Sequence, residues 1–376
     1  MVKHTEGGAG LRGQVAGETA LCTVGEDASG LTYRGYDIQA LAEQASFEEV
    51  AYLLQYGGLP TRSELEDYHS RLAQKRELPR ALLDTLEHIP ATAHPMEVMR
   101  TGCSMLGVLE PEPDFEHQDE SIERMLAALP TIICYWYHYS HFDRSIDLHS
   151  AADSIAEHYL TLLHQQTPDP TSVKVMQASL ILYAEHEFNA STFAARVAAS
   201  TLTDIYSAVT AAISTLRGPL HGGANEAVMA LIESFEDPDD AEQQLLEKLA
   251  AKEKIMGFGH AVYETSDPRN AIIKAWAKTL AQGRPDDQAL FDIAERCETV
   301  MWREKALFPN ADFYHAPAYH SLGIPTPLFT PIFVMARTSG WTAHIKEQRD
   351  HNRIIRPRAQ YTGPEPRTFT PVDERR

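Results

Sequence analysis

Three short segments place titratable side chains beside glycine or at turns, where core packing gains little. They are residues 217–225 (RGPLHGGAN), 257–263 (GFGHAVY) and 309–315 (PNADFYH). Because glycine lets a ligand or another backbone approach closely, His221 and His260 are expected on turns beside a cleft. Imidazoles and carboxylates are common in proton transfer and in the binding of developing charge. Taken singly, each histidine could instead cap a helix, and Asp312 could be an N-cap.

The elements that must hold these segments are mostly helices. Thr61 and Glu64 have the spacing of a capping box, which predicts a helix start with Leu65, Tyr68 and Leu72 on one face. In residues 286–305, apolar side chains recur every three or four positions, the period of one helix face. That pattern predicts an amphipathic helix with a buried stripe of Leu290, Ile293, Ala294, Cys297, Val300 and Met301.

A third helix is expected to begin at residues 266–269 (SDPR), where a capping residue precedes a proline suited to the first helical position. Arg269 should therefore lie in the first turn. The first thirty-odd residues, rich in Gly, Thr and Val, indicate short strands or loops. No alternating pattern of a sheet protein follows, so the fold class is all-α. The Pro-rich tail from Pro364 is expected to be mobile.

Composition excludes several classes of protein. The 376 residues carry 33 Lys and Arg against 53 Asp and Glu, a formal charge of −20, which would repel nucleic acid and anionic lipid. Any anionic ligand must then meet a local basic pocket. The four cysteines lie far apart, which suggests neither a zinc ribbon nor a disulfide framework. With no apolar stretch long enough to span a bilayer, the expected location is cytoplasmic.

The order and spacing of the three segments resemble the citrate synthase family: GPLHGGAN, then GFGH with Arg269 nine residues after His260, then NADF. The resemblance covers nearly the whole chain, through residues 31–36 (LTYRGY), 354–357 (IIRP) and 361–363 (YTG). A joint match of this length is highly specific, whereas one segment alone would be weak. Within the family, the bacterial 2-methylcitrate synthases are most similar, through residues 17–25 (GETALCTVG), 135–141 (YWYHYSH) and 182–191 (LYAEHEFNAS).

This resemblance implies a helical homodimer with an active site between two domains in each subunit. The large domain would comprise residues 1–221 and 321–376, and the small domain residues 222–320. The implied reaction condenses propionyl-CoA, and acetyl-CoA as well, with oxaloacetate and water. The products would be 2-methylcitrate or citrate, and CoA. No cofactor is implied, because the acyl-CoA is a substrate, and neither nucleic acid nor a membrane is an expected partner.

The catalytic roles also come from the resemblance. Asp312 would remove the proton beside the thioester carbonyl, and a desolvated cleft would raise its basicity. His221 would donate a hydrogen bond to the thioester oxygen, and His260 would polarise the ketone of oxaloacetate. The two carboxylates of oxaloacetate suit arginine forks. By resemblance the binding residues are His186, Arg269, Arg337 and Arg356, the last contributed by the partner subunit.

The expected CoA site is the glycine-containing loop with Ile255, Gly257, Phe258 and Gly259. Tyr183 and Ala311 match positions near the acyl pocket, and Ala311 is smaller than the aliphatic residue often found there, which leaves the acyl preference open. One alternative is a citrate synthase that prefers acetyl-CoA, since one methylene is worth only about 1–3 kcal/mol. Others are a metal-dependent hydrolase that uses the three histidines and Asp312 as ligands, and a non-enzymatic helical scaffold.

Overall fold

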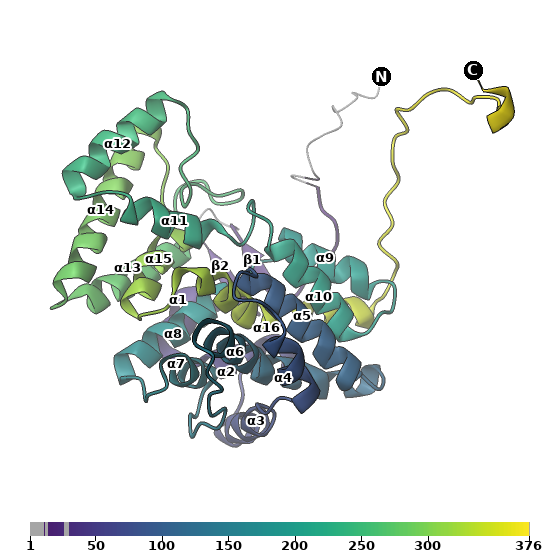
Figure 1. Ribbon diagram of the computed structural model, residues 1–376, viewed down its shortest axis with the longest axis horizontal. Helices are drawn as coiled ribbons and strands as arrows, with labels where there is room; N and C mark the ends of the chain where they lie inside the picture. The colour runs from purple at the N-terminus through teal and green to yellow at the C-terminus, as the bar shows by residue number, and fades with distance from the viewer. Residues whose placement is uncertain (1–10, 12–13, 26–29, 376) are drawn as a thin grey trace.

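The computed structural model describes residue 11, residues 14–25 and residues 30–375. These residues form sixteen α-helices and one small sheet, which confirms the prediction of an all-α fold. Figure 1 shows how the helices are arranged. The prediction of short strands near the start of the chain is also confirmed. The other residues of this N-terminal segment, 1–10, 12–13 and 26–29, lie outside the described residues.

The sheet is antiparallel, with the order β1 (Cys22–Val24), β2 (Leu31–Tyr33), β3 (Tyr36–Asp37). Cys22 pairs with Tyr33, and both side chains are buried beneath the sheet. The chain enters the first helix at Asp37. The Asp37 carboxylate accepts hydrogen bonds from the backbone amides of Gln39 and Ala40 and so caps that helix.

Most helices surround one long central helix, α16 (Phe329–Asp350). Residues 329–345 of α16 are buried on every side, which is the pattern of a helix inside a core. The helices around it are α1 (Ile38–Gln44), α2 (Phe47–Tyr56), α3 (Arg62–Gln74), α4 (Arg80–Glu87), α5 (Pro95–Leu109), α6 (Gln118–Phe142), α7 (Ile155–His164), α8 (Pro170–Tyr183), α9 (Ala190–Ala199) and α10 (Ile205–Leu216). Of these, α2, α5, α6, α8, α9 and α10 contact α16 directly.

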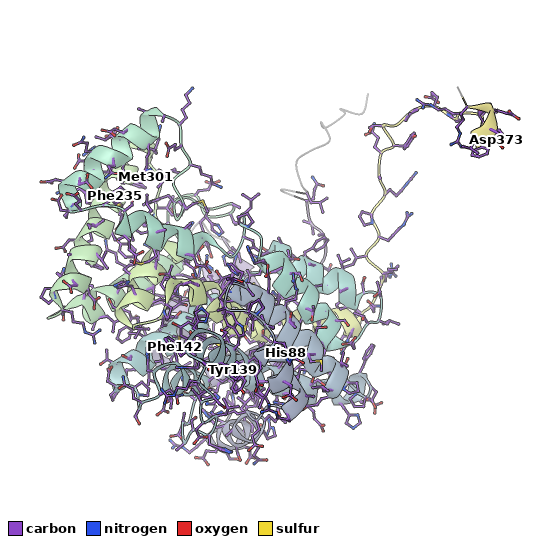
Figure 2. The ribbon with its side chains drawn as sticks, viewed as in Figure 1. His88, Tyr139, Phe142, Phe235, Met301 and Asp373 are labelled. Atoms are coloured by element: carbon purple, nitrogen blue, oxygen red, sulfur yellow. The ribbon has the colours of Figure 1, made fainter. Side chains whose placement is uncertain are left out.

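Five further helices pack on one another beside this core: α11 (Ala224–Glu233), α12 (Pro238–Ala250), α13 (Pro268–Ala281), α14 (Pro285–Lys305) and α15 (Ala311–Ser321). Figure 1 shows them at the left of the view. In Figure 2, Phe235 and Met301 lie within this group, whereas Tyr139 and Phe142 lie among the other helices. Contacts of α13 with α1 and α8 join the two groups, so residues at the joint can face both.

The helix boundaries predicted from the sequence are confirmed where local signals were strongest. Thr61 and Glu64 form a capping box at the start of α3, and Tyr68 and Leu72 are buried on one face, with Leu65 half-buried. Asp267 caps α13, with Pro268 at the first position and Arg269 in the first turn. The predicted helix over residues 286–305 is α14.

Short 3-10 helices complete the chain at η2 (Phe115–His117), η3 (Thr326–Leu328) and η4 (Val372–Glu374). After α16 the chain continues as an exposed, extended tail, and Asp373 lies near its far end, away from both groups of helices (Figure 2). The mobility of this tail remains a prediction.

Candidate active site

A cavity of about 500 Å³ lies where the two groups of helices meet. All the site residues predicted from the sequence line it, except Arg356. They come from segments that are far apart in the chain: the end of α8 and the turn after it, the turn before α11, the loop before α13, and the helices α13, α15 and α16. The fold thus gathers in one place the residues that the sequence pattern singled out.

Asp312 lies in the first turn of α15, and the hydroxyl of Tyr183 donates a hydrogen bond to its Oδ1 at 2.6 Å. The N-cap of α15 is Asn310, which accepts the Asp312 amide at 3.1 Å, so the Asp312 carboxylate is not used as the cap. Burial raises the pKa of Asp312, although the Tyr183 hydrogen bond opposes part of this shift. The result is a buried, ionisable carboxylate on the wall of the cavity, suited to act as a base.

His260 is held in one tautomer by the backbone. Its Nδ1 accepts hydrogen bonds from the amides of Val262 at 3.1 Å and Tyr263 at 3.2 Å. An amide only donates, so Nδ1 carries no proton and Nε2–H is the free donor. Burial and the charge of Arg269 lower the pKa of His260 to about 4, which keeps the ring neutral at pH 7.

His221 lies on the turn that precedes α11. Its Nε2 is 2.8 Å from Ser191 Oγ and accepts the Ser191 amide at 3.3 Å, which leaves the proton on Nδ1 of the neutral ring. Burial, and then the charge of Arg337, lower the pKa of His221 to about 4. His221 is therefore a second neutral donor in the cavity.

Arg269 is buried and forms a two-pronged ion pair with Asp267. Its Nε donates to Oδ1 at 2.9 Å and its Nη2 to Oδ2 at 2.8 Å. Oδ2 of Asp267 also accepts the amide of Ala311 at 3.0 Å. Asp267 consequently joins the start of α13 to the start of α15 and fixes Arg269 beside Asp312.

Arg337 lies in the middle of α16 and is almost fully buried. Its Nε donates to the carbonyl of Tyr183 at 2.6 Å, and its guanidinium carbon lies 4.7 Å from the centre of the Phe333 ring. No residue in the described part of the chain accepts a hydrogen bond from its two terminal nitrogens. Because buried charges are normally paired, these nitrogens are ready to bind an anion in the cavity.

His186 lies beside both His260 and Tyr263. Its Nε2 is 3.1 Å from the Tyr263 hydroxyl, and the ring centres of His186 and His260 are 5.1 Å apart. Burial and the nearby Arg269 lower the pKa of His186 well below its usual value, so this ring is neutral as well. The side chain can exchange hydrogen bonds with a polar ligand without adding charge.

The predicted CoA loop is joined to the Asp312 helix by backbone hydrogen bonds. Gly257 accepts the Asn310 amide at 2.9 Å, and the amide of Gly259 donates to Phe308 at 2.8 Å. Gly257 has a φ of +86°, and a Cβ there would lie 2.5 Å from Val228 and 2.8 Å from Phe313. Only glycine fits this position without a clash. The loop itself forms part of the wall of the cavity.

Arg356 is the one predicted site residue that lies away from the cavity of its own chain. It is exposed, in the tail that follows α16. Past Ile355, the hydrogen bonds of the tail's described residues stay within the tail. The assignment of Arg356 to a partner's site remains a prediction.

Sequence reasoning missed several residues that support the site. The sequence indicates Asp267 only as a helix cap, and it indicates no role for Ser191, Tyr263 or Phe333. Beside a local hydrogen bond to Asn189, Ser191 contacts side chains 30 and 150 positions away in the chain. Beside a local hydrogen bond to His260, Tyr263 contacts a side chain 77 positions away. Only the acid in the DPR motif gave a local signal, since a carboxylate two positions before an arginine can pair with it.

The described residues contain no group of three or more His, Cys, Asp or Glu side chains close enough to hold a metal ion, so the three histidines and Asp312 do not form a ligand cluster. They also contain no helix whose length and apolar character would let it cross a membrane.

Comparison with known proteins shows the relationship directly. The family model described as "Citrate synthase, C-terminal domain" matches residues 10–358. The chain belongs to the citrate synthase family. It is 61% identical to the 2-methylcitrate synthase of Shewanella oneidensis over 368 residues, which covers 98% of each chain. It is 43% identical to citrate synthase 2 of Bacillus subtilis, over 97% of this chain and 98% of the relative.

A solved member of the citrate synthase family has the same fold. The enzyme from Thermoplasma acidophilum, in a ternary complex with carboxymethyl coenzyme A and oxaloacetate, superposes with a TM-score of 0.91 at 32% sequence identity. The match covers 97% of this chain and 98% of that one. Because the similar proteins include both citrate synthases and 2-methylcitrate synthases, membership of the family does not by itself choose the acyl group.

Proposed function

We propose that this protein condenses propionyl-CoA with oxaloacetate and water to form 2-methylcitrate and CoA, and that it accepts acetyl-CoA to form citrate. The observation that carries the proposal is the cavity in which the Asp312 carboxylate faces two neutral histidines, His221 and His260. The 61% identity to a 2-methylcitrate synthase favours propionyl-CoA as the preferred substrate.

The first step removes a proton from the carbon beside the thioester carbonyl. Asp312 takes this proton, and burial favours the transfer because it raises the pKa of the carboxyl. The negative charge that develops on the thioester oxygen is bound by Nδ1–H of His221, the nitrogen turned away from Ser191. A neutral donor suffices, since the hydrogen bond strengthens as the charge grows.

The second step forms the carbon–carbon bond. Nε2–H of His260 donates to the ketone oxygen of oxaloacetate, which makes the carbonyl carbon more electrophilic. The enolate carbon attacks it, and the former ketone oxygen takes the Nε2 proton of His260 to become a hydroxyl. His260 regains a proton, and Asp312 loses the one it took, before the next turnover. Water then attacks the thioester of the condensed product, and the thiol of CoA leaves with a proton.

Oxaloacetate carries two carboxylates, and the cavity offers two buried arginines from different elements. The terminal nitrogens of Arg337 can bind one carboxylate as a fork. The Asp267 ion pair uses Nε and Nη2 of Arg269 and leaves Nη1 for the ligand. His186 lies beside His260 and can hold a further oxygen of the same molecule.

The subunit and domain organisation belong to the same proposal. Residues 222–320 would form a small domain that moves against the rest, with the site at the joint. Two chains would form a cytoplasmic homodimer in which Arg356 of each chain completes the site of the other. The exposed tail, which extends away from its own helices in Figure 1, supports such an exchange.

The acyl and CoA positions complete the assignment. The loop with Ile255, Gly257, Phe258 and Gly259 would bind CoA, since its backbone reaches the cavity wall. Tyr183, which donates a hydrogen bond to Asp312, and Ala311, which precedes Asp312 in α15, would line the acyl pocket. We propose that the small side chain of Ala311 accommodates the extra methyl of propionyl-CoA.

The test is release of free thiol by the purified protein with oxaloacetate and each of acetyl-, propionyl- and butyryl-CoA. We expect release that requires oxaloacetate, with kcat/KM highest for propionyl-CoA. A higher value for acetyl-CoA would make the protein a citrate synthase by preference. Hydrolysis of acyl-CoA without oxaloacetate, abolished by a chelator, would instead support the metal-dependent hydrolase.

A further inference from the structure

The turn that carries His186 is strained and must be held in place. It joins α8 to α9, and Glu187, the residue after His186, has a φ of +53°. Residues with a side chain rarely adopt this left-handed conformation, which costs energy unless surrounding contacts stabilise it. Those contacts therefore determine where the His186 imidazole lies.

One sulfur atom contacts the residues on both sides of His186. The thiol of Cys22 donates to Oε1 of Glu185 at 3.3 Å, and the amide of Glu187 donates to Cys22 Sγ at 2.9 Å. Cys22 lies on β1, more than 160 residues earlier in the chain. Burial, and then the negative charge of Glu185, raise the pKa of the Cys22 thiol, so it keeps the proton that it donates.

The sheet partner of Cys22 holds the same turn. The hydroxyl of Tyr33 lies 3.0 Å from the carbonyls of Ile181 and Glu185 and accepts the Glu185 amide at 3.3 Å. Since Cys22 and Tyr33 are directly paired across β1 and β2, the small sheet presents two adjacent side chains to this turn. This contact explains why the N-terminal motifs GETALCTVG and LTYRGY accompany the site.

The carboxylate of Glu185 depends on few donors. It is fully buried, and His344 Nε2 donates to Oε1 at 2.7 Å because Arg196 Nε already donates to His344 Nδ1 at 2.9 Å. Its other oxygen, Oε2, has no hydrogen-bond partner in the described part of the chain. Loss of the thiol would leave this buried charge with one hydrogen bond fewer, and the turn would then be free to shift.

We infer that Cys22 is a positioning residue for the oxaloacetate site: its thiol fixes the turn of Glu185 and Glu187 and thereby aims His186 into the cavity. This inference rests on the proposed function, since it assigns His186 to oxaloacetate. Cys22 lies at the back of the turn and does not line the cavity, so it does not touch the substrate.

The test compares three variants of the full-length protein by steady-state kinetics and thermal unfolding. Cys22→Ala removes both interactions, and Cys22→Ser keeps a donor and an acceptor. Cys134→Ala is the matched control, because Cys134 is fully buried and its sulfur lies 3.8 Å from the carbonyl of Tyr159, away from the cavity.

For Cys22→Ala we expect the KM for oxaloacetate to rise by about 3- to 10-fold, the effect of one or two lost hydrogen bonds, with the KM for acyl-CoA within about twofold. Cys22→Ser should recover most of the loss, and Cys134→Ala should lower thermal stability without changing the KM for oxaloacetate. Such a pattern separates positioning from a general loss of stability.

An oxaloacetate KM for Cys22→Ala within twofold of the wild type would overturn the inference, and so would an equal rise in Cys134→Ala. If Cys22→Ala does not fold, Tyr33→Phe decides by the same criterion, because it removes the paired contact with Glu185 and keeps the ring. A wild-type protein that releases no thiol with oxaloacetate would refute the proposed function instead, so the two failures are distinguishable.

Discussion

The hydroxyl of Tyr183 donates a 2.6 Å hydrogen bond to Oδ1 of Asp312, although 129 residues separate them in the chain. Tyr183 is the last residue of α8, and Asp312 lies in the first turn of α15. The bond orients the carboxylate and favours its ionised form, whereas burial favours the protonated form. The basicity of Asp312 is thus a balance between these two effects.

Removal of this hydroxyl should shift the pH dependence of the reaction. In Tyr183→Phe, burial of Asp312 is no longer opposed by the hydrogen bond, so its pKa rises further and the acid limb of kcat/KM moves to higher pH. A pH–rate profile measures the shift. Tyr319→Phe is the control, because the Tyr319 hydroxyl lies 2.6 Å from Ser179 Oγ and makes no hydrogen bond to Asp312. An equal shift in that variant would contradict the role of the Tyr183 hydrogen bond.

Loss of the base itself should remove turnover. Asp312→Asn keeps the shape of the side chain and can still accept the Tyr183 hydrogen bond, so stability should change little. We expect kcat to fall by at least about 10²-fold, the usual contribution of a general base. Near-normal turnover in a thiol-release assay would show that another group removes the proton.

Complementation between variants tests whether Arg356 acts across a dimer interface. Arg356→Ala should weaken oxaloacetate binding, and Asp312→Asn should be inactive. A hybrid of the two contains one site with both wild-type residues only if Arg356 belongs to the partner's site. The two variants should regain activity when they are mixed and refolded together or co-expressed. A confirmed heterodimer without activity would refute the exchange of Arg356 between subunits.

Oxaloacetate should bind first and close the site. His260, Arg269 and Asp312 come from the proposed small domain, and His186 and Arg337 from the remainder, so the ligand would bridge both. Closure would exclude water while the enolate exists. Small-angle scattering should show compaction with oxaloacetate alone. Calorimetry should show that an acyl-CoA analogue binds more tightly when oxaloacetate is present. By linkage, an affinity for the analogue that oxaloacetate leaves unchanged would exclude ordered closure.

As the pH is lowered, the fold should begin to lose stability at a pH well above the pKa of ordinary carboxylates. The pKa of buried His158 and of His315 is lowered to about 3, chiefly by burial, and that of His221 and His260 to about 4. The unfolded chain takes up protons near pH 6.5 while the folded chain does not, so stability is lost as the pH falls below that value.

Scanning calorimetry should therefore show a Tm at pH 5 that is at least about 5 °C below the Tm at pH 7.5. His158→Gln, which cannot be protonated, should reduce this difference. His149→Gln should leave it unchanged, because the His149 side chain is largely exposed. A Tm that does not depend on pH over this range would show that the buried histidines are protonated in the folded state.

Local sequence signals were enough to predict the helices that begin at capping motifs and the residue types of the site. Thr61 with Glu64, and Asp267 with Pro268, define helix starts because a cap acts on amides two or three positions away. The order of the segments around His221, His260 and Asp312 indicated the family, since motif spacing is a property of the chain.

Which side chains contact one another in the site depends on how the helices pack. The bond between Tyr183 and Asp312, and the contact of Cys22 with the turn around His186, join residues more than a hundred positions apart. Periodicity and capping rules cover a few residues and carry no information on such pairs. Burial, which sets the protonation of Asp312 and keeps the histidines neutral, exists only once the helices have packed around the cavity.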